Sequence, residues 1–92
     1  MDLYWVTKAN QDPIKLINEH PGRFPLWHVK DMDNTPEKNF TEVGNGTIDF
    51  KKIFTYADKA GLKYFFVEQD KTPGSPFDSI SKSIAYVKAN LV

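Results

Sequence analysis

The sequence predicts an α/β fold with the element order βαβαβα and parallel strands. Three short apolar runs alternate with three segments that carry helical periodicity or helix-capping residues. Strands that alternate with helices are joined by right-handed crossovers, and they form parallel sheets that helices cover. The 92 residues are 40% hydrophobic and 26% charged, which is the composition of a globular domain. We therefore expect residues 1–92 to form a single domain.

The first βα unit occupies the amino-terminal part of the chain. The apolar run DLYWV, residues 2–6, is the first predicted strand. In NQDPIKLINEHPG, Asp12 can cap a helix, Pro13 suits its first turn, and Gly22 lies just beyond its end. These residues predict a helix near residues 13–20.

The second unit begins with the strand RFPLWHVK, residues 23–30, and a long loop follows from Asp31 to Thr47. In IDFKKIFTYADKAG, Asp49 can cap the start of a helix and Gly61 its end. Apolar residues recur here at the spacing i, i+3, i+4 and i+7, in Phe50, Ile53, Phe54 and Ala57. This spacing predicts one amphipathic helix.

The third unit completes the pattern. The run KYFFVEQ, residues 63–69, has few polar interruptions and predicts a strand, and TPGSP, residues 72–76, predicts a turn. Ser75 is expected to cap the last helix, and Pro76 suits its first turn. The apolar residues of that helix are expected to form one stripe, made of Phe77, Ile80, Ile84, Val87 and Leu91.

Composition excludes several classes of function. The twelve basic and twelve acidic residues cancel, so no overall positive field attracts nucleic acid or anionic lipid. Cysteine is absent, which excludes disulfides and thiolate metal sites. No stretch approaches the roughly 18 apolar residues of a membrane span, and the amino terminus carries no signal-peptide pattern. We expect a cytoplasmic protein, unless a signal belongs to a longer parent chain.

Polar side chains follow the predicted strands at their carboxyl ends, where ligands collect in folds of this type. The second strand ends at His28 and Lys30, the third ends at Glu68, and the first unit contributes Asp2. Side chains alternate along a strand, so His28 and Lys30 share one face. One imidazole with two carboxylates suits Mn²⁺, Mg²⁺, Co²⁺ or Zn²⁺. We therefore expect Asp2, His28 and Glu68 to form a metal site.

Structural roles remain open for the same residues. His28 can be a hydrogen-bonded structural side chain, and Glu68 can form a salt bridge with Lys30 or with a neighbouring strand. Lys30 and Asp31 can be the solvated end of a strand. On spacing alone, both tryptophans are expected to pack in the core rather than to contact a substrate.

Four ordered motifs resemble a known family. DLYWVTKANQDP, HPGRFPLWHVKDM, EVGNGTIDFKKIF and KYFFVEQD are similar to the carboxyl-terminal part of the xylose-isomerase-like TIM barrels, the sugar phosphate isomerase/epimerase group. The resemblance covers nearly the whole chain. It implies the last third of a (β/α)8 TIM barrel, which takes about 250 residues in full. The chain would then be a partial barrel domain and not a closed barrel by itself.

The resemblance also implies a set of metal ligands. Family members hold a divalent metal with two glutamates, an aspartate and a histidine. Asp2 in DLYW, His28 in HVKD and Glu68 in VEQD match three of them, and the other glutamate lies on an earlier strand with no counterpart here. Many epimerases of the family carry a histidine three residues after the aspartate. This chain departs from that pattern, because the position is Trp5.

The implied activity is that of a metal-dependent sugar or sugar phosphate isomerase or epimerase. Glu68 would exchange a proton on the carbon next to the carbonyl group. Lys30 would bind a substrate oxygen or counter the developing negative charge, and Trp5 would form a wall of the sugar pocket. The same barrel family includes lyases and dehydratases, which are the alternative. It also includes an apurinic endonuclease, which the zero net charge disfavours.

The resemblance leads to a further expectation about partners. Three βα units cannot close a barrel, so an open piece exposes strand edges and an apolar face. We expect the chain to form a homo-oligomer or to associate with the missing barrel portion, and to be inactive alone. A non-catalytic fragment that assembles through these edges is another interpretation.

Overall fold

The fold is a small parallel sheet with helices packed on one of its faces. The structure is a computed structural model, and it describes residues 1–70, 72 and 74–91. Its elements are, in chain order, α1 (Leu3–Lys8), α2 (Pro13–Glu19), β1 (Leu26–Val29), β2 (Asp31–Met32), β3 (Phe40–Thr41), α3 (Phe50–Phe54), α4 (Ala57–Ala60), β4 (Tyr64–Val67) and α5 (Pro76–Asn90). The predicted α/β class, with parallel strands and no closed barrel, is confirmed.

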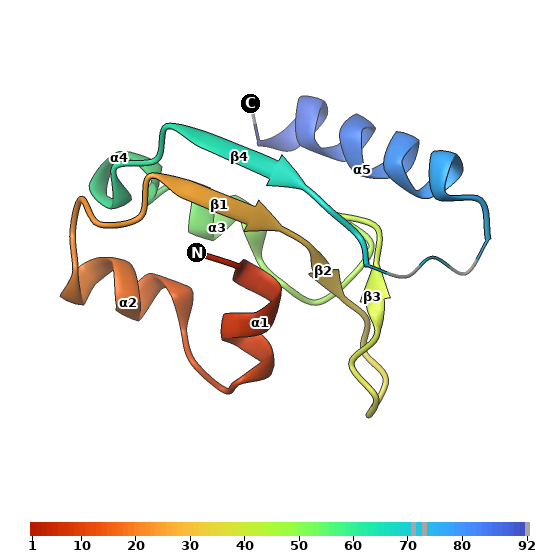
Figure 1. Cartoon of the computed structure of the whole chain (residues 1–92), viewed down its shortest axis with the longest axis horizontal. Coiled ribbons are helices and arrows are strands. Elements are labelled where there is room, and N and C mark those ends of the chain that lie inside the picture. Colours follow the sequence, from red (N-terminus) through yellow and green to blue (C-terminus); the bar gives the residue numbers. More distant parts are fainter. Residues whose placement is uncertain (71, 73, 92) are drawn as a thin grey trace.

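β1 and β4 are the parallel pair at the centre of the molecule. Leu26 lies opposite Tyr64, and His28 lies opposite Phe66. In Figure 1 the two strands lie side by side, α3 lies behind them, and α5 runs beside β4. The connection from β1 to β4 is therefore a crossover through helices, as the sequence predicts.

The two faces of this sheet have different environments. On one face Trp27 and Val29 are fully buried in the apolar core, where Trp27 packs edge-to-face on Phe54 with ring centroids 5.2 Å apart. On the other face Leu26 and Tyr64 are exposed. The sheet therefore buries one face in the core and leaves part of the other face uncovered.

The first apolar run forms a helix and not the predicted strand. Of residues 2–6, Asp2 alone pairs with the sheet, through an isolated parallel bridge to His28, and α1 begins at the next residue. The Asp2 carboxylate accepts the backbone N–H of Trp5 at 3.0 Å and caps α1, while Leu3 and Tyr4 are buried. A short apolar run cannot by itself distinguish a strand from a buried helical turn, so the prediction failed here.

The predicted helix over residues 48–61 is interrupted. Asp49 caps α3 by accepting the Lys52 N–H at 3.1 Å, and Gly61 ends α4 in the left-handed conformation at φ 75°, both as expected. Between the two helices the Thr55 hydroxyl donates to the Lys52 carbonyl at 2.6 Å, and the Thr55 N–H donates to the same oxygen. This local bonding tightens the turn and separates α3 from α4.

The segment predicted as a loop contains a small antiparallel hairpin of β2 and β3. Beyond β3, the chain is attached to α5. The Val43 N–H donates to the Ser83 hydroxyl at 3.0 Å, and Gly44, at φ 93°, lies so close to the Tyr86 ring that a Cβ atom would overlap it. Glycine is therefore required at position 44 for both its conformation and its size.

The last helix forms as predicted, but its apolar stripe is largely uncovered. Phe77 is 84% exposed, and Ile80 and Ile84 are also exposed, whereas the side of α5 that packs inward carries Ser79, Ser83 and Val87. Ser75 occupies the N-cap position, yet its side chain makes no capping hydrogen bond to the described helix. The predicted turn over residues 72–76 includes Pro73, which lies outside the described residues.

Among the described residues, no helix has the length and apolar character that crossing a membrane requires.

Candidate active site

The carboxyl ends of β1 and β4 bring two of the predicted site residues into contact. His28 lies within β1, Glu68 follows β4 directly, and His28 Nδ1 meets Glu68 Oε1. The register of the strands sets this contact, because the Glu68 N–H donates to the Val29 carbonyl at 3.0 Å. The side chains remain 45% and 38% exposed. A carboxylate and an imidazole are therefore accessible to solvent at this edge of the sheet.

Lys30 forms a second charged group at the same edge. Its Nζ lies 2.8 Å from Asp2 Oδ2 and 3.4 Å from Asp70 Oδ1, and its side chain is 7% exposed. Burial lowers the pKa of Lys30, but its hydrogen bonds with Asp2 and Asp70 and their charges outweigh burial and raise the pKa above its ordinary value. The Glu68–Lys30 salt bridge considered from the sequence is absent, since Glu68 pairs with His28 instead.

Asp2 lies beside His28 but makes other interactions. Its Oδ1 accepts the Trp5 N–H that begins α1, and its Oδ2 pairs with Lys30. Both carboxylate oxygens of Asp2 therefore have partners within the chain. The structure thus divides the predicted cluster into a His28–Glu68 pair and an Asp2–Lys30 pair.

The chain has side chains of the kinds that bind divalent metals, but they do not lie together in one group. His28 and Glu68 supply an imidazole nitrogen and a carboxylate oxygen, a combination that Mn²⁺ and Zn²⁺ accept. Within residues 1–70, 72 and 74–91, no three side chains of His, Asp or Glu lie together as a set that could hold a metal ion. The third expected ligand, Asp2, is directed to Lys30. In the described part of the chain, Asp2, His28 and Glu68 therefore do not lie together around one point.

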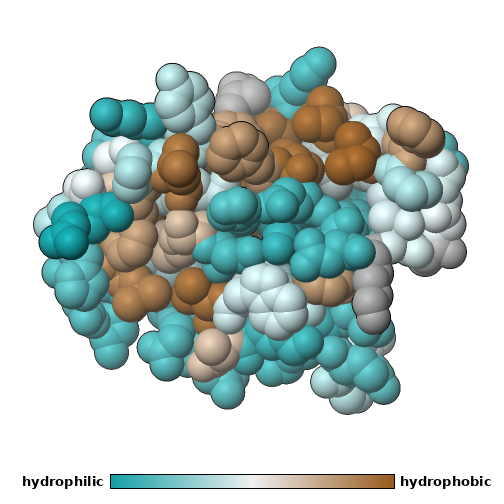
Figure 2. Space-filling model, in the orientation of Figure 1, coloured by the Kyte–Doolittle hydropathy of each residue, from teal (hydrophilic) through white to brown (hydrophobic). Residues whose placement is uncertain are grey.

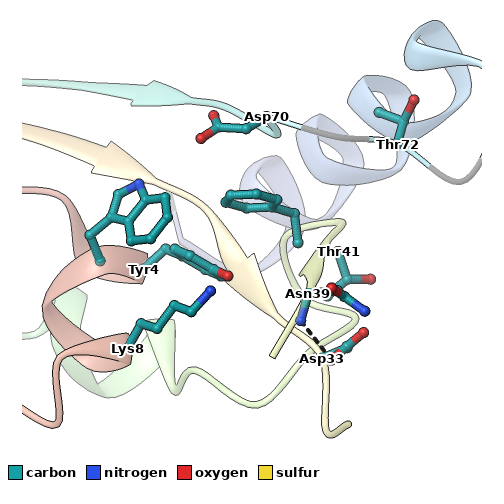
Figure 3. Close-up of a pocket in the computed structure, with 9 residues that line it drawn as sticks. Tyr4, Lys8, Asp33, Asn39, Thr41, Asp70 and Thr72 are labelled. Carbon is teal, nitrogen blue, oxygen red and sulfur yellow. Dashed lines mark hydrogen bonds between the residues drawn. The ribbon is translucent and has the colours of Figure 1, made fainter. Parts of the chain in front are cut away.

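A cavity of about 710 Å³ is lined by Asp70, whereas His28, Lys30 and Glu68 do not line it (Figure 3). Its aromatic wall consists of Tyr4, Trp5 and Phe40, with the Tyr4 and Phe40 rings stacked at 4.4 Å between centroids. The Lys8 ammonium lies 5.2 Å from the centroid of the Trp5 ring, a cation–π geometry. The polar lining of the cavity consists of Lys8, Asp33, Asn39, Thr41, Asp70 and Thr72.

The two tryptophans lie in different environments, core packing having been expected for both on spacing alone and a place in the pocket wall for Trp5 from the family resemblance. Trp27 is fully buried, whereas Trp5 is 46% exposed and lines the cavity. The Asp2 cap explains this difference, because it starts a helix that carries Trp5 to the cavity wall.

The interpretation of Asp31 as a solvated strand end was wrong. Its side chain is fully buried and accepts four backbone N–H groups, from Met32 at 2.8 Å, Gly44 at 3.0 Å, and Gly46 and Ile48 at 3.1 Å each. Burial raises the pKa of Asp31, and the four hydrogen bonds oppose that rise. Asp31 therefore holds the chain between β3 and α3 in place.

Some residues of the site were not identified from the sequence. Tyr4 and Phe40 belong to separate segments, and no periodic pattern connects them. Asp70 follows β4 in the VEQD motif, and its place two residues after Glu68 is the signal that could have indicated it. Asp31 accepts four backbone N–H groups only because the loop has one particular conformation, which the sequence does not show. The sequence signal for this role is limited to Gly44 and Gly46, two of the residues whose N–H groups it accepts.

Comparison with known proteins gives a consistent set of relatives. The chain is 35% identical over 104 residues to the inosose dehydratase of Serratia proteamaculans, a match that covers 92% of this chain and 35% of that protein. It is 29% identical over 99 residues to the inosose dehydratase of Geobacillus thermodenitrificans, covering 87% and 33%. The chain thus spans about a third of the length of the curated relatives that it matches.

A solved structure has the same fold over the same span. A sugar phosphate isomerase/epimerase from Parabacteroides distasonis superposes with a TM-score of 0.74 and 32% sequence identity, covering 96% of this chain and 29% of that one. No family model matches the chain.

Proposed function

Because the chain is related to the xylose-isomerase-like TIM-barrel proteins and corresponds to part of one barrel, we propose that it belongs to an enzyme that moves a proton next to the carbonyl group of a sugar. The observation that carries this proposal is the contact between His28 and Glu68 at the strand ends. Ligands of parallel α/β folds bind at this edge.

Within this proposal Glu68 is the base. Its carboxylate would accept the proton from the substrate carbon, and the His28 imidazole in contact with it would orient the carboxylate. Lys30 would act from behind Asp2 and Asp70, because its charge favours the negative charge that develops on the substrate oxygen. The side chain of Lys30 is 7% exposed, and its ammonium group contacts Asp2 and Asp70.

We also propose that the intact enzyme uses a divalent metal. His28 and Glu68 would be the ligands from this chain, and the remaining ligands would come from the rest of the barrel. When bound, the metal would supply a Lewis acid next to the substrate oxygens.

Two reactions share the same proton abstraction. In an isomerase or epimerase, a proton returns to the neighbouring carbon or to the other face of the same carbon. In a dehydratase, the electron pair left by the proton expels a hydroxyl group from the next carbon, and that group takes up a proton from a general acid and leaves as water. The Parabacteroides structure favours the first reaction, and the inosose dehydratases favour the second.

The cavity supports a polyhydroxylated substrate. Trp5 and Phe40 offer aromatic surface against which the C–H groups of a sugar or of a ketone such as inosose would pack. Asn39, Thr41 and Asp33 offer amide, hydroxyl and carboxylate groups for the substrate hydroxyls.

We propose that the uncovered surfaces of the chain bind the rest of a TIM barrel. Figure 2 shows hydrophobic surface along α5 and hydrophilic surface at the carboxyl ends of β1 and β4. Tyr64 and Phe66 of β4 are exposed, and so are Phe77 and Ile84 of α5. A further strand and helix would pair with β4 and pack on α5. Size-exclusion chromatography tests this partner by comparing the elution of the chain with and without a fragment that carries the rest of the barrel. A discrete homo-oligomer whose elution does not change when that fragment is added would contradict the proposal.

A chimera tests the proposed activity. This chain would replace the matching third of the Serratia inosose dehydratase, and NMR in D2O would follow deuterium uptake next to the carbonyl group and loss of water. Because Glu68 supplies the base, Glu68→Gln should abolish both signals. Glu37→Gln makes the same change on an exposed side chain and is the control. A folded chimera with Glu68→Gln that keeps full activity would refute the proposal.

A further inference from the structure

Asn45 and Gly46 form a dipeptide that can modify itself. Asn45 is the one asparagine of the sequence that precedes a glycine, and both residues are exposed. In such a pair the backbone nitrogen of the glycine can attack the side-chain amide of the asparagine, because glycine has no side chain to hinder the approach. On sequence alone, Asn45 is therefore the asparagine most open to spontaneous deamidation.

The reaction proceeds through a cyclic imide. The Gly46 nitrogen loses its proton and forms a bond to Asn45 Cγ, while the bond between Cγ and the side-chain nitrogen breaks and that nitrogen takes up the proton and leaves as ammonia. Water then opens the ring at either carbonyl group, which gives aspartate or isoaspartate at position 45. In isoaspartate the main chain runs through the former side chain and is longer by a carbon atom.

The buried carboxylate of Asp31 requires glycine at position 46. A Cβ atom there would lie 2.5 Å from Asp31 Oδ1 and would also overlap the Met32 carbonyl oxygen. A residue with a larger side chain would slow the attack on Asn45, but the loop has no room for it. The packing of the loop therefore retains the reactive dipeptide.

The same carboxylate holds the nitrogen that would attack. The Gly46 N–H donates to Asp31 Oδ2 at 3.1 Å. The Asn45 side chain is held separately, since its Nδ2 donates to Thr41 Oγ1 at 3.3 Å. An N–H group that donates to a charged acceptor must give up a strong hydrogen bond before its nitrogen can react.

We propose that Asn45 is a site of spontaneous deamidation, and that Asp31 suppresses the reaction while the loop is in place. Opening of the loop frees the Gly46 nitrogen and permits the reaction. Isoaspartate then hinders reclosure, because the added main-chain atom directly precedes Gly46 and Ile48, whose N–H groups Asp31 accepts. Deamidation thus turns a reversible opening into a permanent one.

Peptide mass spectrometry on the purified chain, incubated in mildly alkaline buffer, measures the rate of deamidation at Asn45. A synthetic peptide of residues 41–49 gives the rate without the fold. The chain should react at least about tenfold more slowly than the peptide, which is the effect of a hydrogen bond to a charged acceptor. Asp31→Asn places an NH2 group against the Gly46 N–H and should move the rate towards that of the peptide. Asp58→Asn makes the same change on an exposed side chain and should leave the rate unchanged.

Hydrogen exchange of the Gly46 amide supplies a second measurement if Asp31→Asn does not fold. Exchange and deamidation both require the Gly46 N–H to leave Asp31, so the unaltered chain should protect this amide to the same extent as it slows deamidation. Three outcomes would overturn the inference. They are deamidation of the chain as fast as that of the peptide, no acceleration in folded Asp31→Asn, and a Gly46 amide that exchanges as freely as in the peptide.

Discussion

Asp31→Asn is a substitution for which the structure predicts a large loss of stability. The carboxylate of Asp31 accepts two N–H groups on each oxygen. An asparagine side chain keeps one acceptor oxygen and places an NH2 group against the other two donors. Two backbone N–H groups therefore lose their acceptor in a site where the native side chain is fully buried.

The expected loss follows from those two donors. Each backbone donor left without a partner destabilises a fold by about 1–3 kcal/mol, which gives about 2–6 kcal/mol for the pair. The bonds from Gly44 and Gly46 are partly buried, so we expect the lower half of this range if the amide oxygen keeps Met32 and Ile48. A domain of this size has a free energy of unfolding of about 5–14 kcal/mol. The variant should therefore lose a large fraction of its stability.

Urea unfolding followed by circular dichroism measures this effect. Asp58→Asn makes the same chemical change on an exposed side chain of α4 and should leave the unfolding midpoint nearly unchanged. If Asp31→Asn unfolds within about 0.5 kcal/mol of the unaltered chain, the four hydrogen bonds do not stabilise the loop as argued.

Three further substitutions test the packing and the electrostatics. Gly46→Ala would place a Cβ atom against the Asp31 carboxylate, so the variant should lose about 1–3 kcal/mol of stability. Circular dichroism should show this loss as a lower melting temperature, and an unchanged melting temperature would contradict the overlap. Phe54→Ala removes an edge-to-face partner of Trp27 and should destabilise the chain by about 3 kcal/mol in urea, and a loss below about 1 kcal/mol would argue against that packing. The raised pKa of Lys30 means that its contribution to stability is present below the ordinary lysine pKa and lost as pH rises through the folded value. Lys30→Met should therefore flatten the alkaline part of the stability–pH curve, and an unchanged alkaline slope would rule out this contribution.

The sequence predicted those features that depend on local chemistry. Asp12 and Asp49 cap helices as expected, and Gly61 ends one, because capping needs only a few neighbouring residues. The strand containing His28 and the one before Glu68 were also predicted, since continuous apolar runs indicate buried parallel strands.

The features that failed depend on distant parts of the chain. α1 replaces a strand because Leu3 and Tyr4 are buried against other segments, which a five-residue run does not reveal. The apolar stripe that includes Phe77 was identified as a stripe, but its periodicity does not reveal how much of it is buried, and Phe77, Ile80 and Ile84 are exposed. Several carboxylates follow the strands near Lys30, and sequence spacing does not show which of them its ammonium group contacts. In the structure these are Asp2 and Asp70.

The segment that follows β3 is bonded to α5, and this bond limits the order in which the chain can fold. Val43 bonds to Ser83 across 40 residues of sequence, and this contact follows the hairpin that carries Phe40 to the cavity wall. A growing polypeptide synthesises α5 after that hairpin, and closing a long loop has an entropic cost that local helices do not bear. The bond between Val43 and Ser83 therefore forms only after α5 has been synthesised.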